Sequence, residues 1–269
     1  MKKLMNRLPK RVYATVLAAA VLIGLSTSAL AGFGPNRPTK AWTSGVAGFD
    51  HVTFNSFTGV GNGVGDERDF VRGVQVGRDS VWSDPVQNVT QDAEVEAKIY
   101  IHNGADGSLN DAPGNPGIAR NVNVRVALPT GEKQSQDITS YIKASNAQPG
   151  EVFDTLTLTG ANKGNFALEY VAGSAKLHAN GAATNLTAAQ EQALISNSGM
   201  NLADMPGCFD YVREVTFRVK VKMPQYGITK QVRFKGQTAA DWKDSVDAKA
   251  GDSLEWSIKF RNKIGRAHV

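Results

Sequence analysis

The chain has 269 residues, 41% of them hydrophobic, which is enough apolar side chain to bury the core of one large or two modest domains and excludes a disordered polymer. Its formal net charge of +5 arises at the two ends, because five Lys and Arg lie in residues 1–31 and two in 263–269, leaving 23 basic against 25 acidic residues between them. The near-neutral body has no basic stripe interleaved with aromatic residues, so composition excludes nucleic acid as a partner.

Residues 1–31 have the pattern of an export signal. A basic start is followed by the apolar stretch ATVLAAAVLIGL, and Ala29-Leu30-Ala31 has the small-x-small spacing of a cleavage site. We expect cleavage after Ala31 and an extracellular or cell-surface protein. An uncleaved membrane anchor is the alternative, because the apolar stretch is nearly long enough to span a bilayer. Residues 32–45 are rich in Pro, Gly and Thr and are expected to form a flexible linker.

From residue 46 onward, apolar and polar side chains alternate with period two. The alternation is clearest in VEAKIYIHN (95–103), NVNVRVALP (121–129) and EVTFRVKVKMP (214–224). Each predicts a strand with one buried and one solvent-exposed face, and hence antiparallel sheets packed face to face. Turn-forming residues indicate loops at 103–117 and 146–151. The spacing of Thr187 and Gln190 is that of a capping box and predicts one short helix at 186–196.

An internal repeat joins two distant parts of the chain. Residues 82–103 align with 242–262 when one residue is gapped, and seven positions are then identical: Trp82/Trp242, Asp84/Asp244, Val86/Val246, Asp92/Asp252, Glu96/Glu255, Ile99/Ile258 and Asn103/Asn262. We interpret residues 46–223 as one complete β-sandwich and 226–262 as the first strands of a second, truncated repeat domain. Trp82, Asn103, Trp242 and Asn262 are the expected structural residues. Residues 263–269 resemble translated sequencing adapter, so we expect the frame to leave the gene there.

The order of motifs resembles a known type of module. A Trp-x-Asp-x-Val approach at 82–86, the strand VEAKIYIHN, the segment IARNVNVRVALPTG, the string YVAGSA and a closing MPG…VTFRVKV are similar to the immunoglobulin-like repeats of bacterial surface proteins called domain of unknown function eleven. The resemblance implies an all-β, immunoglobulin-like antiparallel β-sandwich of an exported surface protein and brings no catalytic residues. An insertion at about 130–165 and the helical segment depart from it and leave room for a ligand-binding decoration.

Two acidic loops carry the candidate metal ligands. Oxygen ligands of the kind that Ca²⁺ prefers are offered by Asp66 and Glu67 in one loop and by Asp106 and Asp111 in the other. Neither loop has EF-hand spacing, so solvated turns are the other interpretation. No further cofactor is expected, because the glycine-rich stretch at 59–65 leads into DERDF and not into the helix that a dinucleotide site requires.

No catalytic residue is predicted. His51, His102 and His178 each stand alone in the sequence and are expected to be surface or packed side chains. Cys208, the only cysteine, is expected to be a small buried hydrophobe, because no His or Lys lies near it in the sequence. Lys230 and Asn262 are the candidates for a cross-link between strands.

These patterns together predict a non-enzymatic stalk or adhesin-like module. Its partner would be a surface protein or a glycan, with membrane contact only through the signal segment or a C-terminal anchor beyond this sequence. A carbohydrate-binding module or a glycan-active enzyme on the same sandwich is the alternative. The low aromatic content of 8%, without clustered Trp or Tyr outside the repeat strands, favours the structural interpretation.

Overall fold

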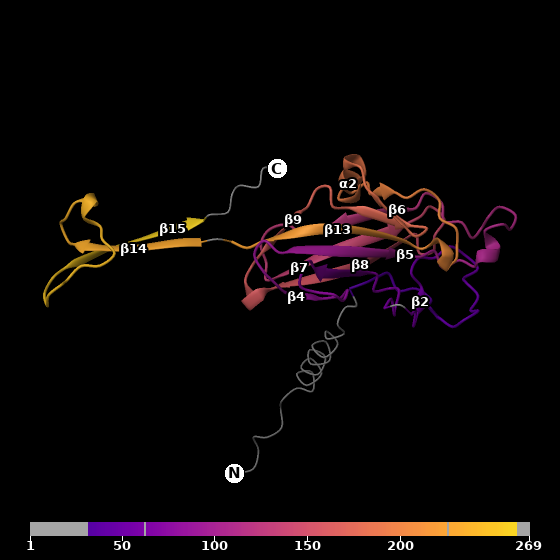
Figure 1. Ribbon diagram of the computed structural model, residues 1–269, viewed down its shortest axis with the longest axis horizontal. Coiled ribbons are helices and arrows are strands. Elements are labelled where there is room, and N and C mark those ends of the chain that lie inside the picture. Colours follow the sequence, from indigo (N-terminus) through magenta and orange to yellow (C-terminus); the bar gives the residue numbers. More distant parts are fainter. Residues whose placement is uncertain (1–31, 62, 225, 263–269) are drawn as a thin grey trace, which may run out of the picture.

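A computed structural model describes residues 32–61, 63–224 and 226–262 (Figure 1). The predicted export signal and residues 263–269 lie outside the described part. Strands account for 42% of the structure and helices for 8%, so the predicted all-β class is confirmed. The strands form two main sheets packed face to face, and a separate two-stranded hairpin follows them (Figure 1).

The first main sheet has the strand order β11-β10-β13-β5-β3, and β9 also pairs with β13. Its strands are β3 (Val71–Gln75), β5 (Glu94–Ile101), β9 (Ala167–Tyr170), β10 (Lys176–Ala179), β11 (Ala182–Asn185) and β13 (Arg213–Lys222). All neighbours in this sheet are antiparallel. The inward residues that the period-two pattern predicts on β5 and β13 are fully buried, which confirms these two strands and their faces.

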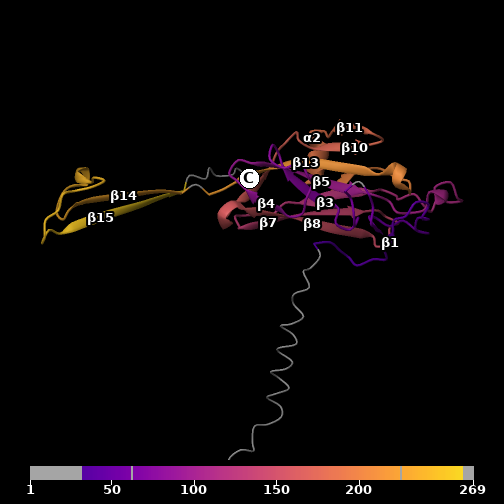
Figure 2. The same ribbon diagram turned by 60° about the horizontal axis from the view of Figure 1, so that its bottom comes forward.

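The second main sheet has the order β12-β6-β7-β8-β4. Its strands are β4 (Val86–Val89), β6 (Asn123–Ala127), β7 (Ser135–Lys143), β8 (Glu151–Gly160) and β12 (Met200–Asn201). Only β4 pairs in parallel, with β8; the other neighbours are antiparallel. Figure 2 shows β13 and β5 in one layer and β7 and β8 in the other. Residues of both sheets belong to one hydrophobic core.

The segment at 130–165 is an integral part of this sandwich. It supplies β7 and β8, and Ile138, Ile142, Leu156 and Leu158 are all fully buried in the core. The expectation of a surface decoration in this segment is therefore wrong, because removing these strands would expose the core face of the opposite sheet.

The predicted helix is present as α2 (Ala188–Leu194), which contacts β6 and β12. Thr187 and Gln190 form the predicted capping box, with each side chain bonding the other's backbone N–H. The short helical turns are η1 (Gly107–Leu109), η2 (Ala161–Lys163), η3 (Phe209–Tyr211) and η4 (Ala239–Asp241). In the described residues, no helix combines the length and the apolar character that crossing a membrane requires.

The segment at 32–45 is packed against the sandwich, in contrast to the predicted flexible linker. Within it, β1 (Lys40–Ala41) pairs in parallel with β2 (Phe57–Thr58). The guanidinium of Arg37 is buried and donates to the carbonyl oxygens of Phe54 (3.0 Å) and Asn55 (2.9 Å). Burial lowers the pKa of Arg37 to about 10. These carbonyls need a donor once they leave solvent, and Arg37 supplies it.

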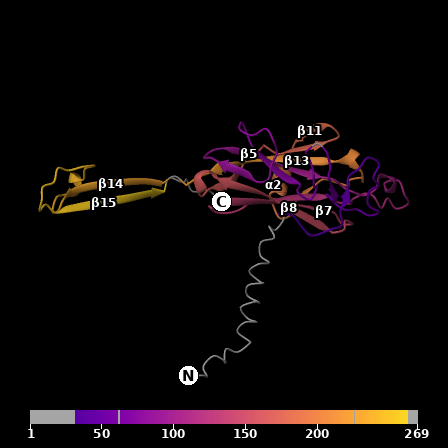
Figure 3. The ribbon, with the colours of Figure 1, turned by 90° about the horizontal axis from the view of Figure 1, so that it is seen from below.

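The hairpin of β14 (Tyr226–Phe234) and β15 (Leu254–Asn262) extends away from the sandwich (Figures 1 and 3). Val232 pairs with Trp256 and exchanges two backbone hydrogen bonds with Lys243, of 2.7 and 3.0 Å. One face of β15 is open to solvent, since Trp256, Ile258 and Phe260 are 54%, 57% and 73% exposed. This face of β15 is therefore both apolar and largely exposed in the part of the chain that the structure describes.

Candidate functional site

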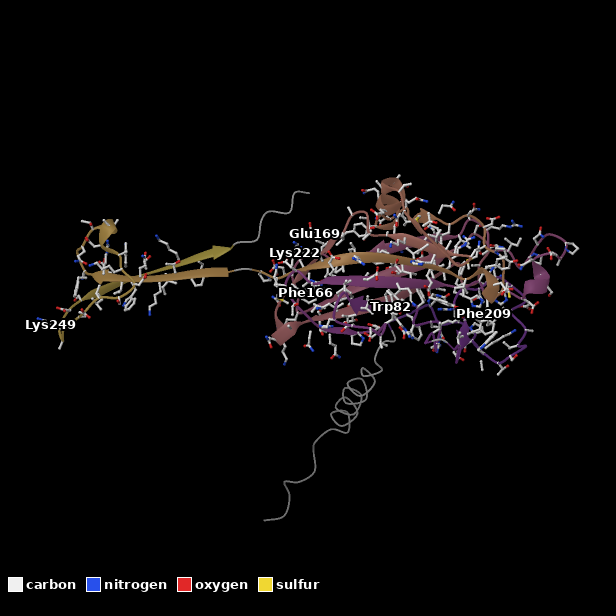
Figure 4. All side chains as sticks on the ribbon, viewed as in Figure 1. Trp82, Phe166, Glu169, Phe209, Lys222 and Lys249 are labelled. Atoms are coloured by element: carbon white, nitrogen blue, oxygen red, sulfur yellow. The ribbon has the colours of Figure 1, made fainter. Side chains whose placement is uncertain are left out.

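A cavity of about 190 Å³ lies at one end of the sandwich. Phe209, which lines it, marks the end of the sandwich that lies away from the β14–β15 hairpin (Figure 4). Trp42, Phe57, His102 and Cys208 also line this cavity. We call it the His102 cavity.

The cavity is built around the end of β5. The strand ends at Ile101, and the next two residues, His102 and Asn103, are fully buried. The Asn103 amide donates to the carbonyl oxygens of Gly117 (2.8 Å) and Met205 (3.0 Å), and its backbone oxygen accepts from the Cys208 N–H at 3.2 Å. Asn103 therefore holds two loops together beside the cavity.

The outward face of β5 is buried at the C-terminal end of the strand. Period-two alternation predicts that Tyr100 and His102 lie on the wet face, but their exposed fractions are only 8% and 0%. Phe57 and Phe209 cover His102: its ring centroid is 5.6 Å from that of Phe57 and 3.9 Å from that of Phe209. Both covering residues lie far from β5 in the sequence, so local alternation could not predict this burial.

His102 is held by a buried carboxylate. Its Nδ1 lies 2.8 Å from Oε1 of Glu67, and both side chains are completely buried. The same carboxylate accepts from the Phe57 N–H at 2.9 Å and from the Tyr100 hydroxyl at 3.3 Å. Burial and the nearby Glu67 carboxylate raise the pKa of Tyr100 well above its usual range, so the phenol stays protonated and donates.

The second ring nitrogen of His102 has no partner. Within the described residues, Nε2 is a buried polar atom without a hydrogen bond. Five other buried side-chain atoms share this property, on Gln75, Asn123, Gln136, Ser140 and Tyr170, and none of these residues lines the His102 cavity. His102 therefore has one hydrogen-bonded ring nitrogen, Nδ1, and one, Nε2, without a hydrogen bond among the described residues.

Cys208 differs from the expected buried hydrophobe. It is half-buried on the cavity wall, and its backbone has φ 103°, a conformation that side-chain-bearing residues rarely adopt. The sequence places no histidine near Cys208, whereas the fold brings it to the cavity that His102 also lines. The alternation of β5 places His102 directly after the strand, and we find no other sequence signal that indicates the position of the His102 cavity.

The four calcium candidates do not come together. Asp66 pairs with Arg68 at 2.7 Å, Asp111 is exposed, and Asp106 accepts from the N–H groups of Gly48 (2.9 Å) and Ser108 (3.0 Å). Glu67 is not in a solvated turn, because its carboxylate points inward to His102. Among the residues that the structure describes, no three His, Cys, Asp or Glu side chains are grouped to hold a metal ion.

Trp82 and Trp242, the tryptophans of the predicted repeat, occupy similar surroundings. Trp82 is half-buried with Lys98 Nζ 5.0 Å from its ring centroid, and Trp242 is half-buried with Arg233 Cζ at 4.4 Å. A second cavity of about 220 Å³ lies beside Trp82, and two of its three charged lining residues, Asp69 and Arg72, pair with each other at 2.9 Å.

The remaining candidates are separate from either cavity. Lys230 pairs with Ile258, whereas Asn262 pairs with Tyr226 at the end of the hairpin, so the register keeps the proposed cross-link partners apart. His51 contacts Asp50 at 2.6 Å, and His178 contacts Thr216 at 3.1 Å. In the glycine-rich stretch, Val60 and Gly65 exchange two backbone hydrogen bonds of 2.8 Å.

Comparison with protein-family models, curated proteins and solved structures finds no match for this chain. Its function is therefore argued from the geometry of the chain itself.

Proposed function

We propose that this chain is an exported, tandem-repeat surface protein in which immunoglobulin-like sandwiches act as structural, adhesin-like modules. The observation that carries the proposal is that the β14–β15 hairpin repeats the strand pairing of β3 and β5. Repeated modules that contact mainly their neighbours are a common way to build extended proteins.

The pairing register of the backbone supports the proposed repeat. Gly73 of β3 pairs with Ala97 and exchanges two backbone hydrogen bonds with Ser83, of 2.9 and 3.0 Å. Val232 of β14 has the same pair of relationships, with Trp256 and Lys243. The aligned sequences match Ser83 with Lys243 and Ala97 with Trp256. Sequence identity and backbone pairing therefore indicate the same correspondence.

The exposed face of β15 supports the same proposal. Its residues Trp256, Ile258 and Phe260 correspond to Ala97, Ile99 and Ile101 of β5, which the second sheet and the core cover completely. A contiguous exposed apolar face of this kind commonly marks a surface that another protein surface covers. We infer that β14 and β15 belong to a second sandwich of the same design.

Export is supported by the pattern of residues 1–31, and a stalk-like arrangement by the placement of the hairpin. The hairpin continues the long axis of the sandwich beyond the end of β13 (Figure 1). Modules that follow each other in this way would hold the first sandwich at a distance from their point of attachment.

Carbohydrate binding remains the alternative function, and the cavity beside Trp82 is the observation that favours it. A half-buried Trp with neighbouring Asp69 and Arg72 provides an apolar surface and polar groups of the kind that sugars use. Because Asp69 and Arg72 already pair with each other, a sugar would have to compete with that ion pair.

Antibodies against the purified sandwich test the proposed function on cells that express the gene. We expect equal labelling of intact and permeabilised cells, and loss of the signal when intact cells are treated with protease. Labelling only after permeabilisation would contradict the proposal. A glycan array tests the alternative: specific binding that Trp82→Ala abolishes and Trp242→Ala preserves would establish a sugar site.

A further inference from the structure

We propose that the His102 cavity binds a small, neutral aromatic or alicyclic molecule that carries one hydrogen-bond donor, of the chemical class of a phenol. This inference concerns the sandwich alone and does not depend on tandem repetition or on export.

The hydrogen-bonding group without a partner on His102 is the ring nitrogen Nε2. Glu67 accepts from the Phe57 N–H and the Tyr100 hydroxyl, so its carboxylate also acts as the acceptor toward His102, and Nδ1 carries the hydrogen. In the neutral ring, Nε2 is then an acceptor. A buried acceptor without a partner is costly, and a ligand that donates one hydrogen bond removes that cost.

The walls of the cavity are largely aromatic. The ring centroids of Trp42 and Phe209 are 4.2 Å apart, and those of Phe57 and Phe209 are 5.3 Å apart. Three aromatic side chains around about 190 Å³ of space suit the faces and edges of one small ring. The combination of apolar walls with a single acceptor is typical of small-molecule sites.

The His102 cavity is unsuited to a charged ligand. An ammonium group has three donors, and among the described residues that line this cavity only His102 has a buried side-chain atom without a hydrogen bond. Desolvating such a cation would cost more than one hydrogen bond returns. An anion would be repelled by the carboxylate of Asp106, a residue that also lines the cavity and whose oxygens already accept from the N–H groups of Gly48 and Ser108. A neutral molecule with one donor avoids both penalties.

The position of the cavity allows access in a tandem array. Phe209 lies at the end of the sandwich opposite the β14–β15 hairpin, and Cys208 on the same wall is only half-buried (Figure 4). A module attached at the hairpin end would leave this cavity uncovered.

Phenol, toluene and benzylamine, added separately to purified ¹⁵N-labelled protein, test the proposal. We expect phenol to shift the Nε2 resonance of His102 and to bind about tenfold more tightly than toluene, which has the same ring without the donor. Phenol should also slow the alkylation of Cys208 by iodoacetamide, a single-site measurement because the chain has one cysteine. Equal binding of phenol and toluene, no shift of Nε2, or tighter binding of benzylamine would overturn the proposal.

Two variants test whether the Nε2 acceptor of His102 determines the preference for phenol. His102→Phe keeps a ring but removes Nε2, and phenol affinity should fall about tenfold to the level of toluene. His178→Phe makes the same substitution at a histidine that does not line the cavity and should preserve the preference for phenol. If His102→Phe does not fold, the comparison of phenol with toluene on the unmodified protein decides the question alone. Alkylation of the urea-unfolded protein should not respond to phenol, which excludes an effect on the reagent.

Discussion

Glu67 and His102 form a completely buried pair in which Oε1 of the carboxylate lies 2.8 Å from Nδ1 of the ring. Glu67 also accepts from Phe57 and Tyr100, so one carboxylate satisfies three buried donors. The pair joins the loop before β3 to the end of β5 and orients His102 on the wall of its cavity.

Glu67→Ala is expected to destabilise the sandwich by about 3–5 kcal/mol, because three buried donors lose their acceptor. Asp66→Ala is the matched control: this neighbouring carboxylate is partly exposed and pairs with Arg68, so its loss should cost about 0–1 kcal/mol. Urea unfolding measures both. Equal effects of the two substitutions would show that the Glu67 network does not stabilise the fold.

Asp154 should make stability depend on pH. Its side chain is buried and accepts from the N–H groups of Val71 (2.7 Å) and Thr155 (2.8 Å), and burial raises its pKa from 3.8 to about 7. The folded state therefore holds a proton that the unfolded state releases between about pH 4 and pH 7, so this group lowers stability as pH rises through that window.

Asp154→Asn removes that titration. The free energy of unfolding of the unmodified protein, relative to the variant, should fall by up to about 4 kcal/mol between about pH 4 and pH 7. Asp204→Asn is the control with the opposite sign, because the hydrogen bond from Arg120 lowers the pKa of Asp204. Its contribution is present above the unfolded pKa and is lost as pH falls. A flat difference for Asp154→Asn would contradict this account.

Gly73→Ala should destabilise the sandwich by about 1–3 kcal/mol, because its Cβ would lie 2.9 Å from side-chain atoms of Leu156 and Val86. Gly61→Ala meets open space and should change stability by less than about 0.5 kcal/mol. Thermal unfolding compares the two variants. A neutral Gly73→Ala would mean that the sheets separate easily enough at this point to admit a methyl group.

Phe217→Ala and Phe260→Ala remove the same side chain from two environments. Phe217 is fully buried between the sheets, and its loss should cost about 3–5 kcal/mol. Phe260 is 73% exposed on the hairpin, and its loss should leave the unfolding of the sandwich unchanged. A clear loss of stability on Phe260→Ala would show that the exposed face of β15 is covered in solution, for example by another copy of the chain.

The proposed export predicts a defined N-terminus. The protein recovered from outside expressing cells should begin at Gly32, as measured by intact mass. Ala31→Asp should block this processing, because a charged residue replaces the small residue at the cleavage position. Secretion of a chain that retains Met1 would contradict cleavage and favour the uncleaved anchor.

Local patterns determined much of the fold. Period-two alternation located β5, β6 and β13 because one face of each strand must enter the core. The spacing of Thr187 and Gln190 located α2 because the capping box uses only neighbouring residues. The sequence similarity of residues 82–103 and 242–262 accompanies backbone pairings that β3–β5 and β14–β15 share.

Only the tertiary structure decided what covers each surface. Arg37 and Glu67 are polar residues in segments that composition describes as a flexible linker and a solvated loop, yet both are buried because distant residues close over them. The end of β5 and the loop that carries Cys208 meet at one cavity because the N-terminal segment and the loops after β5 and before β13 converge there. Alternation reports which side of a strand faces the core, but it carries no information on which remote side chains cover the other side, and at His102 that cover makes the candidate site.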